Sequence, residues 1–268
     1  MRTTLLLAAL ASQAVSECTR AVLKAATDDY TAALKAGKPA FASLGDTVSY
    51  TENRKKVDIK AGILSSALKI DFERHQADQP QCAGFVEAIV TNAAKPYVIH
   101  TQLRLDNTTN KINQIDSIVT TKGDWLFNVT GTYHYASREN WSSIPAAKRD
   151  SREVIKAAGD AYCDLFSNKN TIVPWGTPCA RLEGGAYTGR NVSTDSCNVG
   201  VPSGVKLVNR QYVVDQEYGT VDIIMDFGGT EGNWGAGGLP DSHEFRVEGG
   251  KLRYVHTLSS CGGKKCMG

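Results

Sequence analysis

Two histidines near the C-terminus, His243 and His256, are spaced so that they could act together in acid–base chemistry. Both lie in the segment SHEFRVEGGKLRYVHTL, where the two consecutive glycines suit the turn of a β-hairpin. A turn at this place pairs Glu248 with Lys251 and predicts that His243 lies opposite His256 on one face of the hairpin. Two imidazoles this close disfavour joint protonation, so one of them stays neutral and basic near pH 7. The alternative is that both are hydrogen-bonded residues of the core.

Three side chains upstream are candidates for the same site. Arg181 could bind a carboxylate or anhydride oxygen through its planar guanidinium, and Glu183 could act as a base or orient a histidine. The alternative is an ion pair between these two that stabilises a loop. Tyr162 falls on the inward face of a predicted helix, where its hydroxyl needs a partner. The Gly-rich segment 228–240 is expected to form a loop at the pocket mouth, with Trp234 as a lid.

The chain contains two copies of one sequence unit. VLKAATDDYTAAL at 22–34 recurs as VIKAAGDAYCDLF at 154–166, an offset of 154 − 22 = 132 residues, and weaker matches follow in the same order. A unit of this length is a globular domain and not one turn of a solenoid. Hairpin pairing in the first copy places Thr101 and Asp116 where the second copy has its histidines, and it sends His100 to the other face. The second copy is therefore the predicted site of chemistry.

Each copy begins with an amphipathic helix, continues through an irregular stretch rich in Gly and Pro, and ends in a series of strands. Helices followed by an antiparallel meander predict an α+β domain, with helices packed on one face of a curved sheet. We expect a signal peptide over 1–16, a first domain over 17–135, a linker over 136–150 and a second domain with a C-terminal tail over 151–268.

The N-terminus, MRTTLLLAALASQAVSECTR, has the order of a secretory signal peptide: a positive residue, a short apolar run and small residues before a cleavage site. The apolar run is far shorter than the roughly 20 residues that span a bilayer, so we expect no membrane span. Asn-x-Ser/Thr motifs at Asn107, Asn128, Asn140 and Asn191 fit a secreted glycoprotein. A formal charge of +2 without a Lys/Arg block argues against nucleic acid as a partner.

Seven cysteines predict disulfides and not a metal site, because none stands in a CxxC motif or at ligand spacing from histidine. No metal or other cofactor is expected. The first copy holds only two cysteines, which makes them partners by elimination. We expect the bridges Cys18–Cys82, Cys179–Cys197 and Cys261–Cys266, with Cys163 a buried free thiol.

The segments RLEGGAYTG, CNVGVPSG, NRQYVVDQ and PDSHEFRVEGGKLRYVHTLSSC resemble those of a secreted family of filamentous fungi. The helices followed by a bent antiparallel sheet are similar to the nuclear transport factor 2-like fold, also called SnoaL-like or ketosteroid-isomerase-like. This resemblance implies tandem cone-shaped α+β barrels that each close a cavity. It also implies cofactor-independent cyclisation in secondary metabolism, as in the maleidride dimerising cyclases, which couple maleic anhydride monomers.

Two functions follow. The first is a secreted, cofactor-independent isomerase or cyclase that abstracts an acidic proton and cyclises the resulting enolate, with His243 or His256 as the base. Arg181, Glu183 and Tyr162 belong to the same predicted site. The second is a secreted binding protein without catalytic activity. In both cases the expected ligand is a small apolar metabolite or one that bears an anhydride or carboxylate, and the chain could form a homodimer.

Overall fold

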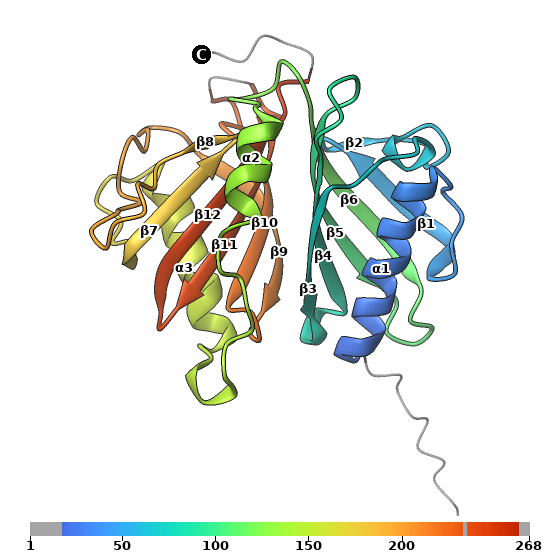
Figure 1. The fold of residues 1–268 in the computed structure, drawn as a ribbon, viewed down its shortest axis with the longest axis horizontal. Coiled ribbons are helices and arrows are strands. Elements are labelled where there is room, and N and C mark those ends of the chain that lie inside the picture. The colour runs from blue at the N-terminus through green and yellow to red at the C-terminus, as the bar shows by residue number, and fades with distance from the viewer. Residues whose placement is uncertain (1–17, 233–234, 263–268) are drawn as a thin grey trace, which may run out of the picture.

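The computed structural model describes residues 18–232 and 235–262, and in this part of the chain each copy is a helix followed by six strands (Figure 1). The first copy consists of α1 (Arg20–Ala36), β1 (Leu44–Glu52), β2 (Lys55–Lys56), β3 (Phe72–Asp78), β4 (Ala83–Val90), β5 (Tyr97–Leu105) and β6 (Ile112–Thr120). The second consists of α3 (Arg152–Leu165), β7 (Trp175–Glu183), β8 (Ala186–Tyr187), β9 (Leu207–Asp215), β10 (Thr220–Phe227), β11 (Leu239–Glu248) and β12 (Lys251–Ser259). Between them α2 (Val129–Ala136) contacts strands of both copies.

Each copy forms one six-stranded mixed sheet. The hydrogen-bonded order is β2-β1-β6-β5-β4-β3 in the first copy and β8-β7-β12-β11-β10-β9 in the second, so the two orders are equivalent. In both sheets the first long strand runs parallel to the last, β1 beside β6 and β7 beside β12. The duplication predicted from the repeat is confirmed. Closure of either sheet into a cone stays a prediction.

The helices of the two copies begin in the same way. Thr19 caps α1 and Ser151 caps α3, each by accepting a hydrogen bond from a backbone N–H in the first turn, that of Val22 or of Val154. Gly37 ends α1 in the left-handed conformation that favours glycine. The caps lie 151 − 19 = 132 residues apart, which is the offset of the repeat.

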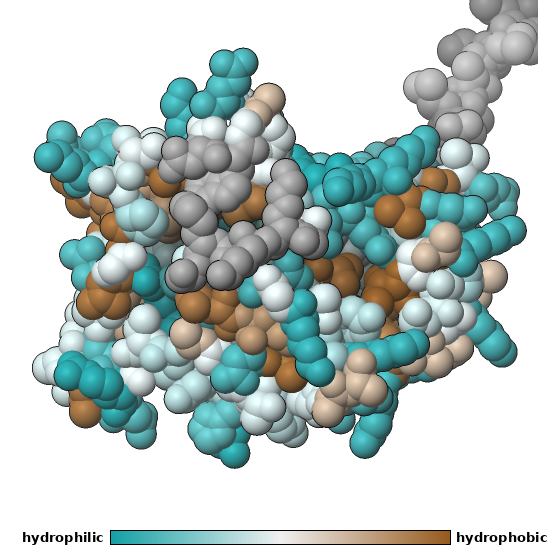
Figure 2. Space-filling view, turned by 90° about the horizontal axis from the view of Figure 1, so that it is seen from above, coloured by the Kyte–Doolittle hydropathy of each residue, from teal (hydrophilic) through white to brown (hydrophobic). Residues whose placement is uncertain are grey.

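The two sheets face each other, and α1 and α3 lie on their outer sides (Figure 1). Successive side chains of a strand therefore point alternately into the core under the helix and into the space between the two sheets. In β5, Ile99 and Leu103 belong to the core under α1, whereas the buried His100 and Gln102 between them are directed at the other sheet. On the outer surface, hydrophobic side chains emerge in patches among hydrophilic ones (Figure 2).

Two reciprocal ion pairs join the copies. Arg20 of α1 binds the carboxylate of Asp215 with two hydrogen bonds of 3.0 and 2.7 Å, and Arg152 of α3 binds that of Asp78 with two of 2.5 and 2.7 Å. Asp215 also accepts from the backbone of residue 77, and Asp78 from that of residue 214. The same contact thus occurs twice, with the roles of the two copies exchanged.

A β-bulge changes the register of the last hairpin. Val247 pairs with Leu252 as predicted, but Arg246 then pairs with Tyr254, so Arg253 is an extra residue on β12. An extra residue shifts every later pair by one position and moves the side chains beyond it to the other face.

The prediction that His243 and His256 face each other is therefore wrong. His243 lies opposite Thr257 on the helix side of the sheet, and His256 lies opposite Glu244 on the side of the first copy. The even spacing around the turn gave no sign of the bulge, which interrupts the alternation of β12 between Leu252 and Tyr254.

The first copy has the same irregularity. After Leu105 its hairpin shifts register, so Thr101 pairs with Ser117 and not with Asp116 as predicted. His100 does lie on the opposite face from Thr101, as expected. It is no bystander, however, since it is fully buried between the sheets with Nδ1 2.8 Å from the hydroxyl of Ser242.

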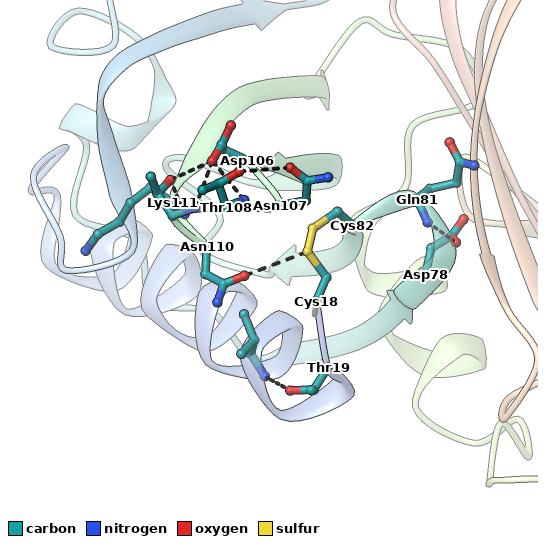
Figure 3. The surroundings of a disulfide bond; sticks show 12 residues. Cys18, Thr19, Asp78, Gln81, Cys82, Asp106, Asn107, Thr108, Asn110 and Lys111 are labelled. Carbon is teal, nitrogen blue, oxygen red and sulfur yellow. Dashed lines mark hydrogen bonds between the residues drawn. A yellow bond between two sulfur atoms is a disulfide. The ribbon is translucent and has the colours of Figure 1, made fainter. Parts of the chain in front are cut away.

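The Cys18–Cys82 disulfide, shown in Figure 3, and the Cys179–Cys197 disulfide are confirmed. Cys163 is a buried free thiol as predicted. Cys266, the predicted partner of Cys261, lies outside the described residues, as do the predicted signal peptide and Trp234. Among the residues described, no helix is long and apolar enough to cross a membrane.

Replacing Asp78 by Ala should lower the free energy of unfolding by about 3 kcal/mol, because Arg152 and a buried backbone N–H lose their acceptor. Urea denaturation measures the change. Asp46→Ala on the exposed part of β1 is the matched control and should change little. Equal effects of the two substitutions would show that the reciprocal pairs contribute nothing.

Candidate active site

A cavity of about 460 Å³ lies between the C-terminal end of α3 and the sheet of the second copy. Most of its wall is apolar, with a few polar side chains. The apolar members are Trp125, Phe166, Pro202, Val205, Phe227 and Leu239, and the polar ones are Glu183, Ser203, His243, Thr257 and Ser259. An apolar wall with a few convergent polar groups is the usual make-up of a small-molecule site.

A wider hollow of about 790 Å³ lies on the surface beside the Cys18–Cys82 bridge. Its titratable carboxylate, Asp106, accepts hydrogen bonds from Thr108 and Thr109 of its own loop. The hollow therefore offers no group free for acid–base chemistry, whereas the second-copy cavity does.

His243 is the central polar residue of the cavity. Its side chain is 2% exposed, and Nδ1 lies 3.3 Å from the carboxylate of Asp241, which is fully buried and accepts a 3.0 Å hydrogen bond from Ser259. The contact between Nδ1 and Asp241 is within ion-pair distance but does not meet hydrogen-bond geometry, so Nδ1 and one carboxylate oxygen of Asp241 are both without a hydrogen bond within residues 18–232 and 235–262. The ring lies beside those of Tyr162 and Phe166. With the carboxylate on the Nδ1 side, Nε2 is the ring nitrogen that faces away from it, and a histidine placed in this way can act as a base.

Arg181 connects two of the other predicted residues. Its guanidinium lies 3.1 Å from a carboxylate oxygen of Glu183 and donates a 3.3 Å hydrogen bond to the hydroxyl of Tyr162. Burial raises the pKa of Tyr162, so its hydroxyl stays protonated. The structure thus brings Tyr162, Arg181, Glu183 and His243 together, and the Arg–Glu ion pair that the sequence left as an alternative is present as well.

His256 is not part of this cavity. It lies between the sheets, with Nδ1 2.9 Å from Glu87 and Nε2 2.6 Å from Glu139. Burial lowers the pKa of His256, but the two carboxylates outweigh that effect and raise it to about 10. A histidine held as an imidazolium by two carboxylates is no base at neutral pH.

Around His256 the two sheets share an inter-sheet charge cluster of Arg74, Glu87, Glu139, Glu244 and His256. The Arg74 guanidinium lies 2.7 Å from Glu87 and 2.5 Å from Glu244. Glu87, Glu244 and His256 could by their spacing hold a metal ion. Arg74 already supplies the cation there, since the same nitrogen approaches all three residues.

The corresponding position in the first copy is filled. The hydroxyl of Tyr30, the counterpart of Tyr162, lies 2.9 Å from that of Thr101, which in turn lies 2.9 Å from that of Ser117. Thr101 and Ser117 occupy the places of His243 and Thr257 in the hairpin. Small hydroxyl side chains bonded to one another leave no basic group at this point.

Sequence reasoning assigned one residue of the second-copy site to a turn and missed two others that lie at or near it. Asp241 follows a proline and reads as a turn residue, yet it is buried one strand alternation from His243. Trp125 comes from the connection after the first copy. Glu139 comes from the predicted linker and binds His256. The Asp-x-His spacing was the one available signal, because it places both side chains on one face of a strand.

Residues 148–259 match a family described as a domain of unknown function (DUF8021). The match spans the second copy and contains the cavity wall except Trp125. A search of curated protein sequences finds no match to the chain.

The inter-sheet charge cluster should make stability depend on alkaline pH. The pKa of His256 is raised from 6.5 to about 10 on folding, so its stabilising contribution is complete below pH 6.5 and is lost as the pH rises toward about 10. The free energy of unfolding, measured by urea denaturation across this range, should fall. In His256→Gln the fall should be shallower. Parallel pH profiles of the two proteins would contradict the raised pKa.

Proposed function

We propose that the protein is a secreted, cofactor-independent isomerase or cyclase that removes a proton next to a carbonyl group in the second-copy cavity. The observation that carries this proposal is His243, a buried histidine on the cavity wall whose Nδ1 lies 3.3 Å from the buried carboxylate of Asp241. The rings of Tyr162 and Phe245 pack against the imidazole. With the carboxylate on the Nδ1 side, Nε2 is the atom available to a ligand.

The proposed reaction starts with transfer of a proton from carbon to Nε2 of His243. The electron pair of the C–H bond moves into the substrate and forms an enolate, whose oxygen gains negative charge. Hydrogen-bond donors aimed at such an oxygen supply much of the stabilisation in reactions of this type. Thr257 is the candidate donor on the cavity wall, with the Tyr162–Arg181 pair behind it. The enolate then takes back the proton at another carbon, or its carbon attacks one end of a carbon–carbon double bond conjugated to a carbonyl, which closes a ring as the π bond breaks, and the resulting carbanion takes the proton from Nε2.

The ketosteroid-isomerase-like resemblance supports the same chemistry, and in this proposal the second sheet and α3 close a cone around the cavity. The most specific reaction that this proposal includes is the coupling of maleic anhydride-type monomers. Arg181 is already engaged by Glu183 and Tyr162, which favours a carbonyl or anhydride oxygen over a free carboxylate as the bound group. The two disulfides fit passage through an oxidising, secretory compartment.

A carrier for a small apolar metabolite is the second candidate. It is favoured by the predominance of apolar side chains in the cavity wall. In a carrier, Nε2 of His243 binds the ligand and accepts no proton from carbon. Proton exchange on a bound carbonyl compound separates the two functions.

The test uses 2-tetralone, a bicyclic ketone whose protons next to the carbonyl exchange with D₂O through the enolate, followed by proton NMR. The wild-type protein should accelerate exchange, and His243→Gln should lower the catalysed rate by about 10²–10⁴-fold. His256→Gln is the matched control and should exchange at the wild-type rate under conditions where it is folded.

Two results would contradict the catalytic proposal. One is a wild-type rate no greater than that of buffer with the ketone demonstrably bound, which leaves the carrier. The other is full activity in His243→Gln, which places the base elsewhere.

A further inference from the structure

The connection that leaves the first copy forms part of the cavity wall of the second. We call residues 121–128, between β6 and α2, the inter-copy strap. The backbone N–H of Trp125 donates to the carbonyl oxygen of Ser259 at the end of β12, and its side chain lines the cavity. The carboxylate of Asp124 accepts a 2.7 Å hydrogen bond from the backbone N–H of Cys261. The strap is thus fixed to the strand that also carries Thr257.

The turn after β7 is shaped to let the strap approach. Gly184 and Gly185 both have positive φ angles, +57° and +117°. A Cβ atom on Gly184 would lie 2.2 Å from the carbonyl oxygen of Trp125, and one on Gly185 would lie 2.2 Å from that of Asn128. Only glycine at both positions lets the strap backbone come this close to the turn.

Some buried polar groups at the cavity wall lack partners. Thr257 is 6% exposed, and its hydroxyl has no hydrogen-bond partner within the described parts of the chain. A buried hydroxyl without a partner costs free energy that a ligand acceptor would recover. The carboxylate of Glu183 lies on the same wall and disfavours an anion there, even beside Arg181. An uncharged carbonyl oxygen accepts a hydrogen bond from Thr257 and brings no negative charge close to Glu183.

The cavity wall also carries aromatic rings. Trp125, Phe166 and Phe227 contribute rings from three different parts of the chain. Aromatic side chains stabilise ring-shaped apolar ligands through stacked and edge-on contacts in addition to burial.

We propose that the cavity takes an uncharged carbonyl compound with a flat apolar ring system, and that Trp125 of the inter-copy strap determines this specificity. The carbonyl oxygen accepts from Thr257, and the ring packs on Trp125. The inference rests on the proposed site but concerns binding, so it holds or fails separately from catalysis. It also means that the site is incomplete without the segment that follows the first copy.

Calorimetric titration tests the ligand class with three probes of similar size: 2-tetralone, which has ring and carbonyl, tetralin, which lacks the oxygen, and 2-naphthoate, which carries a carboxylate. The wild-type protein should bind 2-tetralone at least about fivefold more tightly than either of the others, as expected for one buried hydrogen bond and one unfavourable charge. Thr257→Val, which keeps the shape and removes the hydroxyl, should abolish the preference for 2-tetralone over tetralin.

Strap variants test the role of Trp125 with the same titration. Trp125→Ala should raise the Kd of both 2-tetralone and tetralin by about three- to tenfold through loss of an aromatic contact. Asp124→Ala, which frees the strap without touching the cavity wall, should raise both in the same direction. Leu126→Ala, at a neighbouring position that is 45% exposed, is the matched control and should leave both unchanged.

Unchanged affinity in Trp125→Ala would overturn the role of the strap, and tighter binding of 2-naphthoate than of 2-tetralone would overturn the ligand class. Binding with the predicted preferences but without proton exchange would sustain this inference and refute catalysis. Failure of 2-tetralone to bind the wild-type protein would refute it directly.

Discussion

Charged side chains buried between the two sheets must find partners across the copies, and this requirement governs the arrangement of the molecule. Glu87 and Glu244 come from different copies, are at most 1% exposed, and both approach the guanidinium of Arg74. A buried carboxylate without such a partner would cost several kcal/mol, so neither sheet could bury this face alone. The same requirement is met at the C-terminal ends of β3 and β9, where buried aspartates bind arginines from the helix N-termini of the other copy.

The cluster lies directly behind the candidate site. On β11, Glu244 follows His243, and on β12, His256 precedes Thr257, so each strand presents one residue to the cluster and the next to the cavity. Ion pairs on one face therefore hold the strands that position the base on the other. Together with the inter-copy strap, this gives the first copy a role in the site although its own equivalent position is filled by hydroxyl groups.

The sequence was sufficient for features that repeat or alternate: the duplication, the helix faces and the two disulfides. It was insufficient where one residue changes the outcome. The extra Arg253 moves His256 out of the cavity, and no residue type in the hairpin marks the position as a bulge. His100 was placed on the face away from the predicted site, but nothing in the sequence of a single strand indicates that a second sheet covers that face. Trp125 is brought to the cavity by tertiary contacts that have no local signal.

We infer that the buried charges make the two copies one cooperative unit. Native-state amide hydrogen exchange in low concentrations of denaturant, read by mass spectrometry, tests it on the intact protein. Core amides of β5 and β11 should open with the same free energy and the same denaturant dependence, because neither sheet survives the loss of the other. Exchange of one copy through an opening of clearly lower free energy, with the other still protected, would contradict the account.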